Sequence, residues 1–585
     1  MEKNLDRRQF LTGAGALAAA GVVGSLAASS GLAVASEVGG PSEGGTSNIE
    51  TGPRGRYPWP ATPPVIDPAD IEEEIICDVV VAGAAVGGCC AIRAAAEEGA
   101  KVVLFEKADE PSSQSSQVAV INGQAQARYG RDGMFDVDMI VDHEMDEGSY
   151  YPKRAIWAKW AKHAHEVFDW YIAAAPEEVY FCKDSAENPP EGMSYFVRPQ
   201  MFPVSPNYKW EEETHPTFTT SFGISQLNFN KANVQLAVDQ FGAIAYFRHA
   251  VKQLIMENGR VTGCYAYNYD TKKYKKVTAS KGVVLATGCY INNKEMEAYF
   301  LPDVFEQGIV GEGRLFTGTA LDPEGVPTRQ GDGMVMGDWV GARIARHHAP
   351  MIHHMGNGHN GARSPFGISP FLRLDLNGKR FMCEDAPGQQ TENQFEKLRD
   401  QSCYTFWDAN WGQAIEWNPM AHGMPYMFAE SGQGGGLATQ DSVDRGVEDG
   451  SILKADTLDA LLGMIDDIDR TVALASIQRY NELCHNGKDE DFGKKATRMW
   501  PIETGPFYAF KFGLAPNLTN IGGLESDEDC HTFDADRNII PGLYVAGNMQ
   551  GDRFAVQYPI AMEGVASSMC FYYGYVAGKN VVAGV

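Results

Sequence analysis

A glycine-rich turn between an apolar strand and an alanine-rich stretch constrains the fold of this chain more than any other feature. The run IICDVVV at 75–81 suits a buried parallel strand. The turn GAAVGG follows at 83–88, and an alanine-rich helical stretch continues to Gly99. A second apolar strand is expected at 101–105, and Glu106 follows it. Strand, turn, helix and strand in this order form a βαβ unit, which predicts an α/β fold.

The glycines give this turn a chemical meaning. Glycine lets the backbone approach a pyrophosphate, and the N-terminus of the next helix offers N–H groups and the positive end of its dipole. Glu106 lies 23 residues after Gly83, where an acid can hydrogen-bond a ribose hydroxyl. Ala85 replaces the middle glycine of the usual G-x-G-x-x-G. The turn alone also fits another α/β protein, but the strand, helix, strand and acid together favour a dinucleotide site.

The first 35 residues are typical of an export signal. DRRQFL at 6–11 precedes an uncharged stretch, rich in alanine and glycine, that ends in AVA at 33–35. Paired arginines followed by Phe-Leu resemble a twin-arginine signal. A membrane anchor is the alternative, but the weakly apolar composition favours cleavage. We therefore expect a signal peptide at 1–35, a periplasmic or other extracytoplasmic location, and no membrane span after cleavage.

Composition limits the partners and cofactors. A length of 585 residues predicts two or three domains, and a net charge of −27 disfavours nucleic acid and anionic membrane surfaces. The chain has eleven cysteines but no C-x-x-C, so neither an iron–sulfur run nor a C-x-x-C-H haem motif is present. We expect most of these thiols to be small buried side chains.

Three further glycine turns follow along the chain. After a linker rich in Gly, Pro, Ser and Thr at 36–71, VVLATG at 283–288 is a second strand that runs into a glycine turn. GDG at 331–333 precedes a helical stretch, and PGLYVAGN at 541–548 ends the last expected strand. Each of these motifs alone is common, so their value lies in their order.

That order resembles the flavoproteins of the fumarate reductase/succinate dehydrogenase superfamily. RYNELCHNGKDEDFG (479–493) and PIETGPFYA (501–509) extend the resemblance, which covers residues 75–582. It implies non-covalently bound FAD in a Rossmann-like domain with an inserted α+β capping domain, and a substrate between the cap and the flavin. The implied boundaries are 72–350 and 506–585 for the two parts of the FAD-binding domain and 351–505 for the cap. The implied FAD-binding residues are Gly83, Ala85, Val86, Gly88, Glu106, Lys107, Gln114, Ser115, Ala119, Thr287, Gly288, Asp332, Asn548 and Gly564.

The chain departs from fumarate reductases at both substrate arginines. In those enzymes a proton-donating arginine stands four residues after the glutamate of N-x-G-x-R-F-x-x-E; here NGKRFMCE (377–384) is followed at that place by Gly388. Their carboxylate-binding arginine aligns ten residues after Asn548, at Tyr558. A phenol is neutral at pH 7 and donates one hydrogen bond, which suits a carbonyl oxygen rather than a carboxylate. We therefore expect no useful fumarate reduction.

Tyr558 and Pro559 match a Tyr-Pro pair of the ketosteroid dehydrogenases and cardiac-glycoside reductases in the same superfamily. In those enzymes the tyrosine hydroxyl and a backbone N–H four residues later hold the substrate carbonyl. The later residue is Met562 here, where they have glycine. The alternative is that Tyr558 only fixes a turn before proline.

His353 is the expected second substrate contact, because it aligns with the substrate histidine of fumarate reductases. It lies in the histidine-rich stretch HHAPMIHHMGNGH at 347–359. That stretch also raises the possibility of a metal site, but acids are absent nearby and the superfamily needs no metal. We expect none.

The resemblance implies an exported FAD-dependent oxidoreductase that reduces an activated C=C bond, as in an enone or unsaturated lactone, by hydride transfer from flavin N5. Tyr558 would polarise the carbonyl. The donor of the α-carbon proton stays open among His353, Tyr404 and Tyr426. Two alternatives are a ketosteroid-type dehydrogenase that works in the oxidative direction and a non-catalytic flavin electron-transfer subunit. Export suggests a terminal reductase of anaerobic respiration, supplied by a separate cytochrome or a membrane quinol-oxidising system.

Overall fold

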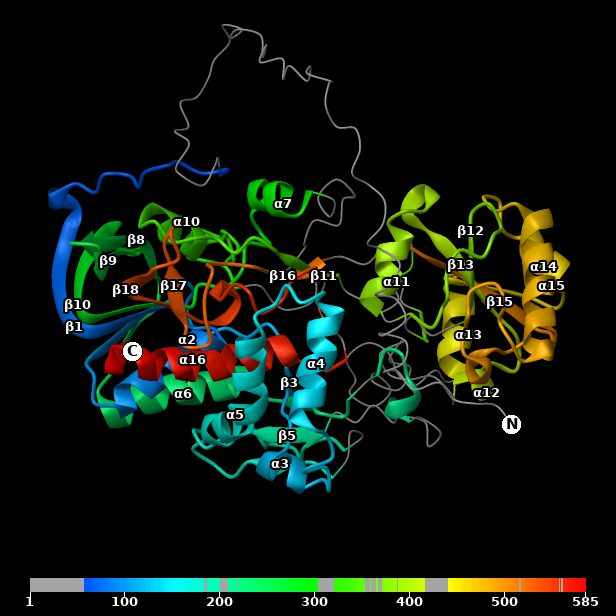
Figure 1. The fold of residues 1–585 in the computed structure, drawn as a ribbon, viewed down its shortest axis with the longest axis horizontal. Coiled ribbons are helices and arrows are strands. Elements are labelled where there is room, and N and C mark those ends of the chain that lie inside the picture. The colour runs from blue at the N-terminus through cyan, green and yellow to red at the C-terminus, as the bar shows by residue number, and fades with distance from the viewer. Residues whose placement is uncertain are drawn as a thin grey trace, which may run out of the picture. The chain divides into compact units, whose positions relative to one another are not determined.

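The βαβ unit lies at the centre of an eight-stranded sheet in the computed structural model (Figure 1). β1 (Ile71–Ala82) pairs in parallel with β2 (Val102–Phe105) on one side and with β10 (Lys273–Leu285) on the other. The expected α/β fold is therefore confirmed. The structure describes residues 57–183, 187–199, 209–216, 218–302, 320–352, 358, 364–366, 371–386, 388–415, 440–514, 517–556, 558 and 561–585.

The sheet brings together strands from both ends of the chain, in the order β17-β18-β10-β1-β2-β7. β18 (Ile539–Val545) pairs in parallel with β10, so that Leu543 lies opposite Val283. The turns that follow these two strands therefore lie side by side. The remaining strands of the sheet are β7 (Ile244–Tyr246), β8 (His249–Glu257), β9 (Arg260–Asn268) and β17 (His531–Phe533).

β1 begins four residues before the apolar run that predicted it. The extra residues include Glu72 and Glu73, and the ammonium group of Lys275 on β10 lies 3.4 Å and 2.5 Å from their carboxylates. Cross-strand pairs of opposite charge stabilise a sheet even where the sequence is polar. Hydrophobicity alone therefore placed the start of this strand too late.

Three helices pack side by side along one face of the sheet: α2 (Val86–Glu97), α6 (Gln226–Phe241) and α16 (Val565–Ala583) (Figure 1). α2 and α16 approach closely because glycine stands at their contact. A Cβ at Gly574 would lie 2.2 Å from the carbonyl oxygen of Gly87, and a Cβ at Gly578 would lie 2.6 Å from that of Ala91. The C-terminal helix is thereby held against the glycine-turn helix.

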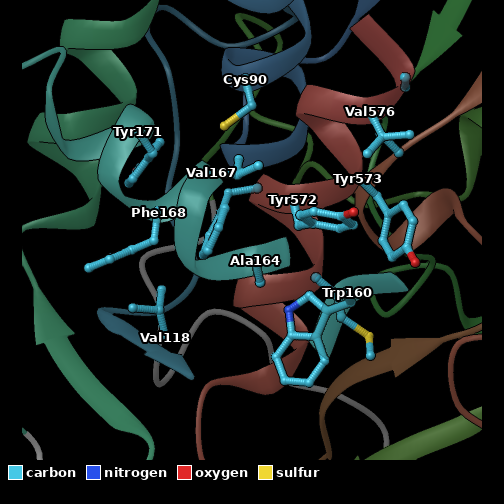
Figure 2. Packing of buried hydrophobic residues seen from close by; sticks show 14 of the residues in the cluster. Cys90, Val118, Trp160, Ala164, Val167, Phe168, Tyr171, Tyr572, Tyr573 and Val576 are labelled. Carbon is cyan, nitrogen blue, oxygen red and sulfur yellow. The ribbon is translucent and has the colours of Figure 1, made fainter. Parts of the chain in front are cut away.

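α5 (Arg154–Ile172) packs its apolar side against α16. Figure 2 shows Trp160, Ala164 and Phe168 along α5 beside α16, and the ring of Phe168 lies 5.9 Å from that of Phe571 in α16. Tyr572 and Tyr573 belong to this core, and the Tyr573 hydroxyl donates to the carbonyl oxygen of Ile156 at 2.5 Å. The buried Tyr573 is stable here because its hydroxyl has a hydrogen-bond partner.

A smaller sheet, in the order β3-β6-β5-β4, supports the start of α16. The main-chain N–H of Ala119 in β3 donates to the carbonyl oxygen of Gly564 at 3.3 Å. The Ser221 hydroxyl, at the start of β6, donates to that of Glu563 at 2.7 Å. The strands are β3 (Gln117–Ala119), β4 (Tyr180–Phe181), β5 (Phe196–Pro199) and β6 (Ser221–Ile224).

A four-stranded antiparallel sheet, in the order β12-β13-β15-β14, forms the core of the expected cap. β15 (Phe507–Phe512) pairs with β13 (Cys403–Trp407) and with β14 (Ile452–Ala455). The boundary expected between residues 505 and 506 therefore divides a sheet and is wrong at this point. The fourth strand is β12 (Leu372–Asp375), and α15 (Arg470–Asn486) packs against it. The other domain boundaries stay predictions.

The remaining elements connect these sheets. They are α3 (Gly123–Ala127), α4 (Val137–Glu147), α7 (Lys294–Phe300), α10 (Asp332–Trp339), α11 (Gly388–Phe395), α12 (Trp411–Ile415), α13 (Gln440–Glu448), α14 (Leu458–Gly463), β11 (Ala349–Ile352), β16 (Asn517–Ile521) and the short 3-10 turns Pro68–Asp70, Trp210–Glu212, Arg399–Gln401, Ala496–Arg498 and Gly547–Met549.

The eleven cysteines are unpaired, and nine of them are buried, as expected for small core thiols. In the part of the chain that the structure describes, no helix combines the length and apolar character that a membrane crossing requires.

Candidate functional site

A cavity opens at the carboxyl ends of β1, β2, β10 and β18. The first residues after these strands, Gly83, Glu106, Ala286 and the turn at Gly547, all line it. The cavity then continues past Tyr558 to the first turn of α16. Ligands of parallel α/β sheets bind at this edge, so the topology alone places the candidate site here.

The glycine turn is held by steric requirements as well as by its sequence. Gly83 has a φ of 101°, and a Cβ there would lie 2.5 Å from the carbonyl oxygen of Ala286. A Cβ at Gly88 would lie 1.8 Å from the carbonyl oxygen of Gly83. Ala85 has a φ of −80°, which any residue adopts, so alanine is tolerated where the usual motif has glycine.

Glu106 ties this turn to the end of β2. Its carboxylate accepts a hydrogen bond from the N–H of Ala84 at 2.6 Å and another from the N–H of Ala108 at 2.8 Å. Burial raises the pKa of the Glu106 carboxyl above its ordinary value, although both hydrogen bonds act in the opposite direction. The acid is thus fixed at the cavity wall, where a ribose hydroxyl can reach it.

Lys107 and Asp332 form an ion pair beside Glu106. The Lys107 ammonium lies 2.6 Å from the Asp332 carboxylate, in the first turn of α10. Burial alone would raise the pKa of Asp332, but Lys107 and Lys252 hold it below its ordinary value. The pair joins the end of β2 to the GDG motif, and both members line the cavity.

The lining fits FAD by its unused hydrogen-bonding groups. The Thr287 hydroxyl and the Gln226 side-chain NH₂ are buried and have no hydrogen-bond partner among the described residues, and both residues line the cavity. Ala85, Val86 and Gly87, at the N-terminus of α2, also face it. A helix N-terminus for a pyrophosphate, an acid for a ribose and free polar groups along one cavity are what a dinucleotide requires.

Most of the predicted FAD-binding residues come together in this cavity, although contact with FAD stays a prediction for each. Those that line it are Gly83, Ala85, Val86, Glu106, Lys107, Gln114, Ser115, Thr287, Gly288, Asp332, Asn548 and Gly564. Gly88 and Ala119 are not part of the lining. Gly88 supports the turn by its lack of a side chain, and Ala119 holds Gly564 through its main chain.

Tyr558 lines the cavity near the first turn of α16. Its hydroxyl oxygen accepts a hydrogen bond from the N–H of Ala566 at 3.3 Å, and its ring lies 5.4 Å from that of Phe554. The residue is 3% exposed, and burial raises the pKa of its phenol. The oxygen is thus anchored by an accepted bond, while the phenol keeps a proton that it can donate.

None of the other predicted substrate contacts is found in the lining of the cavity among the described residues. Met562 is fully buried and is not part of the cavity lining among the described residues. His353 and Tyr426 lie outside the described residues. The Tyr404 hydroxyl donates to the Asp467 carboxylate at 2.9 Å, and its ring packs in the core of the four-stranded sheet. Tyr404 is not part of the cavity lining, so its hydrogen bond with Asp467 indicates a structural role within the sheet.

Several residues of the site were not predicted from the sequence. Arg329 lines the cavity at a φ of 64°, and burial lowers the pKa of its guanidinium. Cys289 and Cys570 line it as well, and Arg553 is fully buried behind it. The position of Arg329, just before the GDG motif, was an available signal. The position of Arg553 gave no such signal, because it lies in none of the motifs described above.

His348 explains part of the histidine-rich stretch. Its Nδ1 lies 2.6 Å from the Tyr290 hydroxyl, and its Nε2 lies 3.0 Å from the carbonyl oxygen of Ala345. Burial lowers its pKa to about 4, so the ring is neutral at pH 7. This histidine packs against the ring of Tyr290, the residue that follows Cys289 of the cavity wall.

Comparison with known proteins gives matches along almost the whole chain. The family described as FAD binding domain matches residues 78–561, and the signal sequence of the twin-arginine translocation pathway matches residues 4–24. Digoxin reductase from Eggerthella lenta is 25% identical over 606 residues, covering 100% of this chain and 98% of that protein.

Two solved structures share the fold. A 3-ketosteroid-Δ4-(5α)-dehydrogenase from Rhodococcus jostii, in complex with 4-androstene-3,17-dione, has a TM-score of 0.61 at 18% identity, covering 89% of this chain and 99% of that one. The open conformation of a flavocytochrome c3 fumarate reductase has a TM-score of 0.55 at 19% identity. The match covers 88% of this chain and 79% of that one. The predicted fold, FAD cofactor and export signal are thereby confirmed.

Proposed function

We propose, since this chain belongs to the FAD binding domain family of flavoproteins, that it is an exported oxidoreductase that reduces an activated C=C bond conjugated to a carbonyl group. The observation that carries this proposal is Tyr558, a buried neutral phenol at the FAD cavity. It stands where fumarate reductases bind a carboxylate with arginine. A relative that is a digoxin reductase, and that aligns with the whole chain, supports the reductive direction.

Tyr558 acts on the substrate carbonyl in this proposal. When bound, reduced FAD supplies the hydride. The hydroxyl donates its proton in a hydrogen bond to the carbonyl oxygen, while its own oxygen stays fixed by the N–H of Ala566. Negative charge develops on the carbonyl oxygen as the β-carbon accepts hydride, and a fixed donor stabilises that charge without reorganisation. The phenol acts as a neutral donor because burial keeps its pKa high.

The substrate class follows from which groups are charged. Gly388 and Tyr558 stand at the two arginine positions of fumarate reductases, so this chain has no cation at either place for a dicarboxylate. A neutral donor suits enones, unsaturated lactones and related unsaturated carbonyl compounds. The shared Tyr-Pro pair also keeps open a ketosteroid-type dehydrogenase working in the oxidative direction.

Electrons would come from a separate donor protein. The twin-arginine signal places the enzyme outside the cytoplasm, and its sequence contains no C-x-x-C-H haem motif. We propose a cytochrome or a membrane quinol-oxidising system as donor, and a role as a terminal reductase in anaerobic respiration. Such a donor would have to reach the flavin from the protein surface.

The function is tested with the flavin as its own reporter. Holoenzyme is reduced under anaerobic conditions with stoichiometric viologen radical and mixed with a panel of enones, unsaturated lactones, simple unsaturated acids and fumarate. We expect flavin reoxidation and a product two hydrogens heavier with an enone or lactone, and no useful rate with fumarate. Brisk fumarate turnover would contradict the assignment of Tyr558. Reaction of the oxidised enzyme with saturated ketones alone would establish the oxidative alternative.

A further inference from the structure

Arg553 lies behind the cavity with no exposure to solvent. Its Nε donates to the carbonyl oxygen of Gln550 at 3.1 Å, and its Nη2 donates to the side-chain oxygen of Asn548 at 2.9 Å. Its Nη1 lies 3.6 Å from the sulfur of Cys570. Each nitrogen of the guanidinium thus has a partner, and every one of these partners is neutral.

The buried arginines of this molecule differ in their partners: Arg131 donates to a main-chain oxygen and forms no ion pair with a described residue, whereas others pair with an acid. Arg498 lies 2.6 Å from the Glu213 carboxylate, and Arg380 lies 2.7 Å from that of Glu384. In the part of the chain that the structure describes, no carboxylate forms an ion pair with Arg553. Arginine stays protonated in proteins, and an isolated buried charge is costly unless an opposite charge lies nearby. A negative group bound close to Arg553 would lower this cost.

The partners of Arg553 show where that negative group belongs. Asn548 and Cys570 both line the FAD cavity, so a single side chain separates the guanidinium from the cavity. Asn548 also donates to the Thr519 hydroxyl at 3.3 Å, and Thr519 lines the cavity too. Arg553 thus holds a polar section of the wall and places its positive charge directly behind it.

FAD brings negative charge of two kinds. Its two phosphates are charged in both redox states. Its ring gains one further negative charge when two electrons are taken up with one proton, whereas uptake of two protons would leave the reduced ring neutral. A nearby fixed cation favours the form with the additional charge, which is one means by which a protein tunes a flavin.

We propose that Arg553 is a positioning residue for Asn548 and Cys570 whose buried positive charge favours the reduced, negatively charged form of the bound FAD. The inference rests on FAD binding and not on the proposed substrate, so it can fail while the proposed function holds, and the reverse. Arg553, which lies in none of the motifs described above, would thus help to set the reduction potential of the flavin.

The test is the midpoint potential of bound FAD, measured in holoenzyme by equilibration with reference dyes during slow anaerobic reduction. Arg553→Gln removes the charge but keeps hydrogen-bonding groups. We expect the reduced form to become at least tenfold less favoured, which lowers the potential of this two-electron couple by about 30 mV. Arg553→Lys retains the charge and should keep the potential within that tenfold limit.

Arg131→Gln is the matched control. Arg131 is also buried, donates to the main-chain oxygen of Thr219 at 2.8 Å and is not part of the cavity lining. Its replacement should leave the potential unchanged. An Arg553→Gln enzyme with weaker FAD affinity but an unchanged potential would overturn the proposal, because the charge would then act only on the phosphates. If Arg553→Gln is isolated without FAD, Arg553→Lys decides: a retained potential supports the role of charge, and a tenfold or larger shift contradicts it.

Discussion

A substitution can remove the hydroxyl of Tyr558 and keep its ring. It therefore distinguishes a catalytic role of the hydroxyl from the packing of the ring. Tyr558→Phe keeps the contact with Phe554, so we expect the folded protein and its FAD to survive. Turnover of an accepted enone should fall by about 10²–10³, the usual effect of deleting one oxyanion donor. The loss should appear in kcat more than in KM, because the hydrogen bond strengthens as charge develops. Steady-state kinetics with reduced viologen measures both.

Tyr171→Phe is the control for this substitution. The Tyr171 hydroxyl is buried as well, but it donates to Asn230 at 2.7 Å and is not part of the cavity lining. Its loss should leave kcat unchanged. Near-normal kcat in Tyr558→Phe would favour the other interpretation of Tyr558, as a residue that only fixes a turn before Pro559.

Glu144 gives a residue-scale prediction about stability. The residue is 2% exposed, and neither carboxylate oxygen has a hydrogen-bond partner among the described residues. Burial, with a smaller effect from Glu147, raises its pKa well above the ordinary 4.5. Above pH 4.5 the unfolded chain therefore ionises at this residue while the folded protein keeps the proton. Stability is lost as pH rises through that window.

Glu144→Gln cannot ionise, so its stability relative to the natural protein should increase with pH. The gain should grow between pH 5 and pH 7 by up to about 1.4 kcal/mol per pH unit. Urea unfolding at the two pH values measures it. Glu178→Gln, at an exposed glutamate, should show no such growth. An equal effect of Glu144→Gln at both pH values would mean that Glu144 is ionised in the folded protein.

Between elements, a buried ion network joins the turn after β12 to the end of α15. The guanidinium of Arg380 lies 2.7 Å from the Glu384 carboxylate and 2.8 Å from that of Asp489. Burial alone would raise the pKa of Asp489, but hydrogen bonds from Arg380 and from the main chain lower it to about 2. The stability that Asp489 contributes is therefore present above pH 4 and lost as pH falls towards 2.

Arg380→Met should destabilise the protein by about 3–5 kcal/mol, because two buried carboxylates lose the guanidinium, although Glu384 keeps Lys494 at 3.5 Å. Urea or guanidinium unfolding at pH 7 measures the loss, which should shrink as the pH approaches 3. Arg479→Ala, at a partly exposed arginine that pairs with Asp491 at 2.9 Å, should cost less than about 1 kcal/mol. Comparable losses in the two variants would show that the Arg380 network adds nothing beyond a surface pair.

The elements also show what the sequence could and could not predict. The glycine turn, Glu106 and the later strand turns were predictable, because short-range sterics and phosphate chemistry require particular residues at particular spacings. The end of the cap could not be predicted, because the apolar sequence of β15 would suit a strand of either domain. Only its pairing with β13 and β14 assigns it to the sheet of the cap. The role of Arg553 depends on contacts with Asn548 and Cys570, and the latter lies seventeen residues away.

At the scale of the whole molecule, the cavity is made by segments that are far apart along the chain. Gly83 and Glu106 come from its beginning, Thr287 from its middle, and Asn548 and Gly564 from its end. The parallel pairing of β10 with β1 and with β18 brings them together. A dinucleotide that fills this cavity would therefore contact segments from the beginning, middle and end of the chain, so we expect cofactor binding and global stability to be coupled.

FAD should consequently stabilise the entire protein and leave it on denaturation. Binding only to the folded state adds about 2.7 kcal/mol when free FAD is present at a hundredfold excess over its Kd. We expect the Tm of protein stripped of flavin to rise continuously as FAD is added, and riboflavin, which lacks the pyrophosphate and the adenosine, to raise it far less. Acid precipitation should release all the flavin into the supernatant, because the predicted link is non-covalent. Yellow precipitate would establish a covalent bond, and a Tm that does not respond to FAD would contradict the predicted coupling of cofactor binding to global stability.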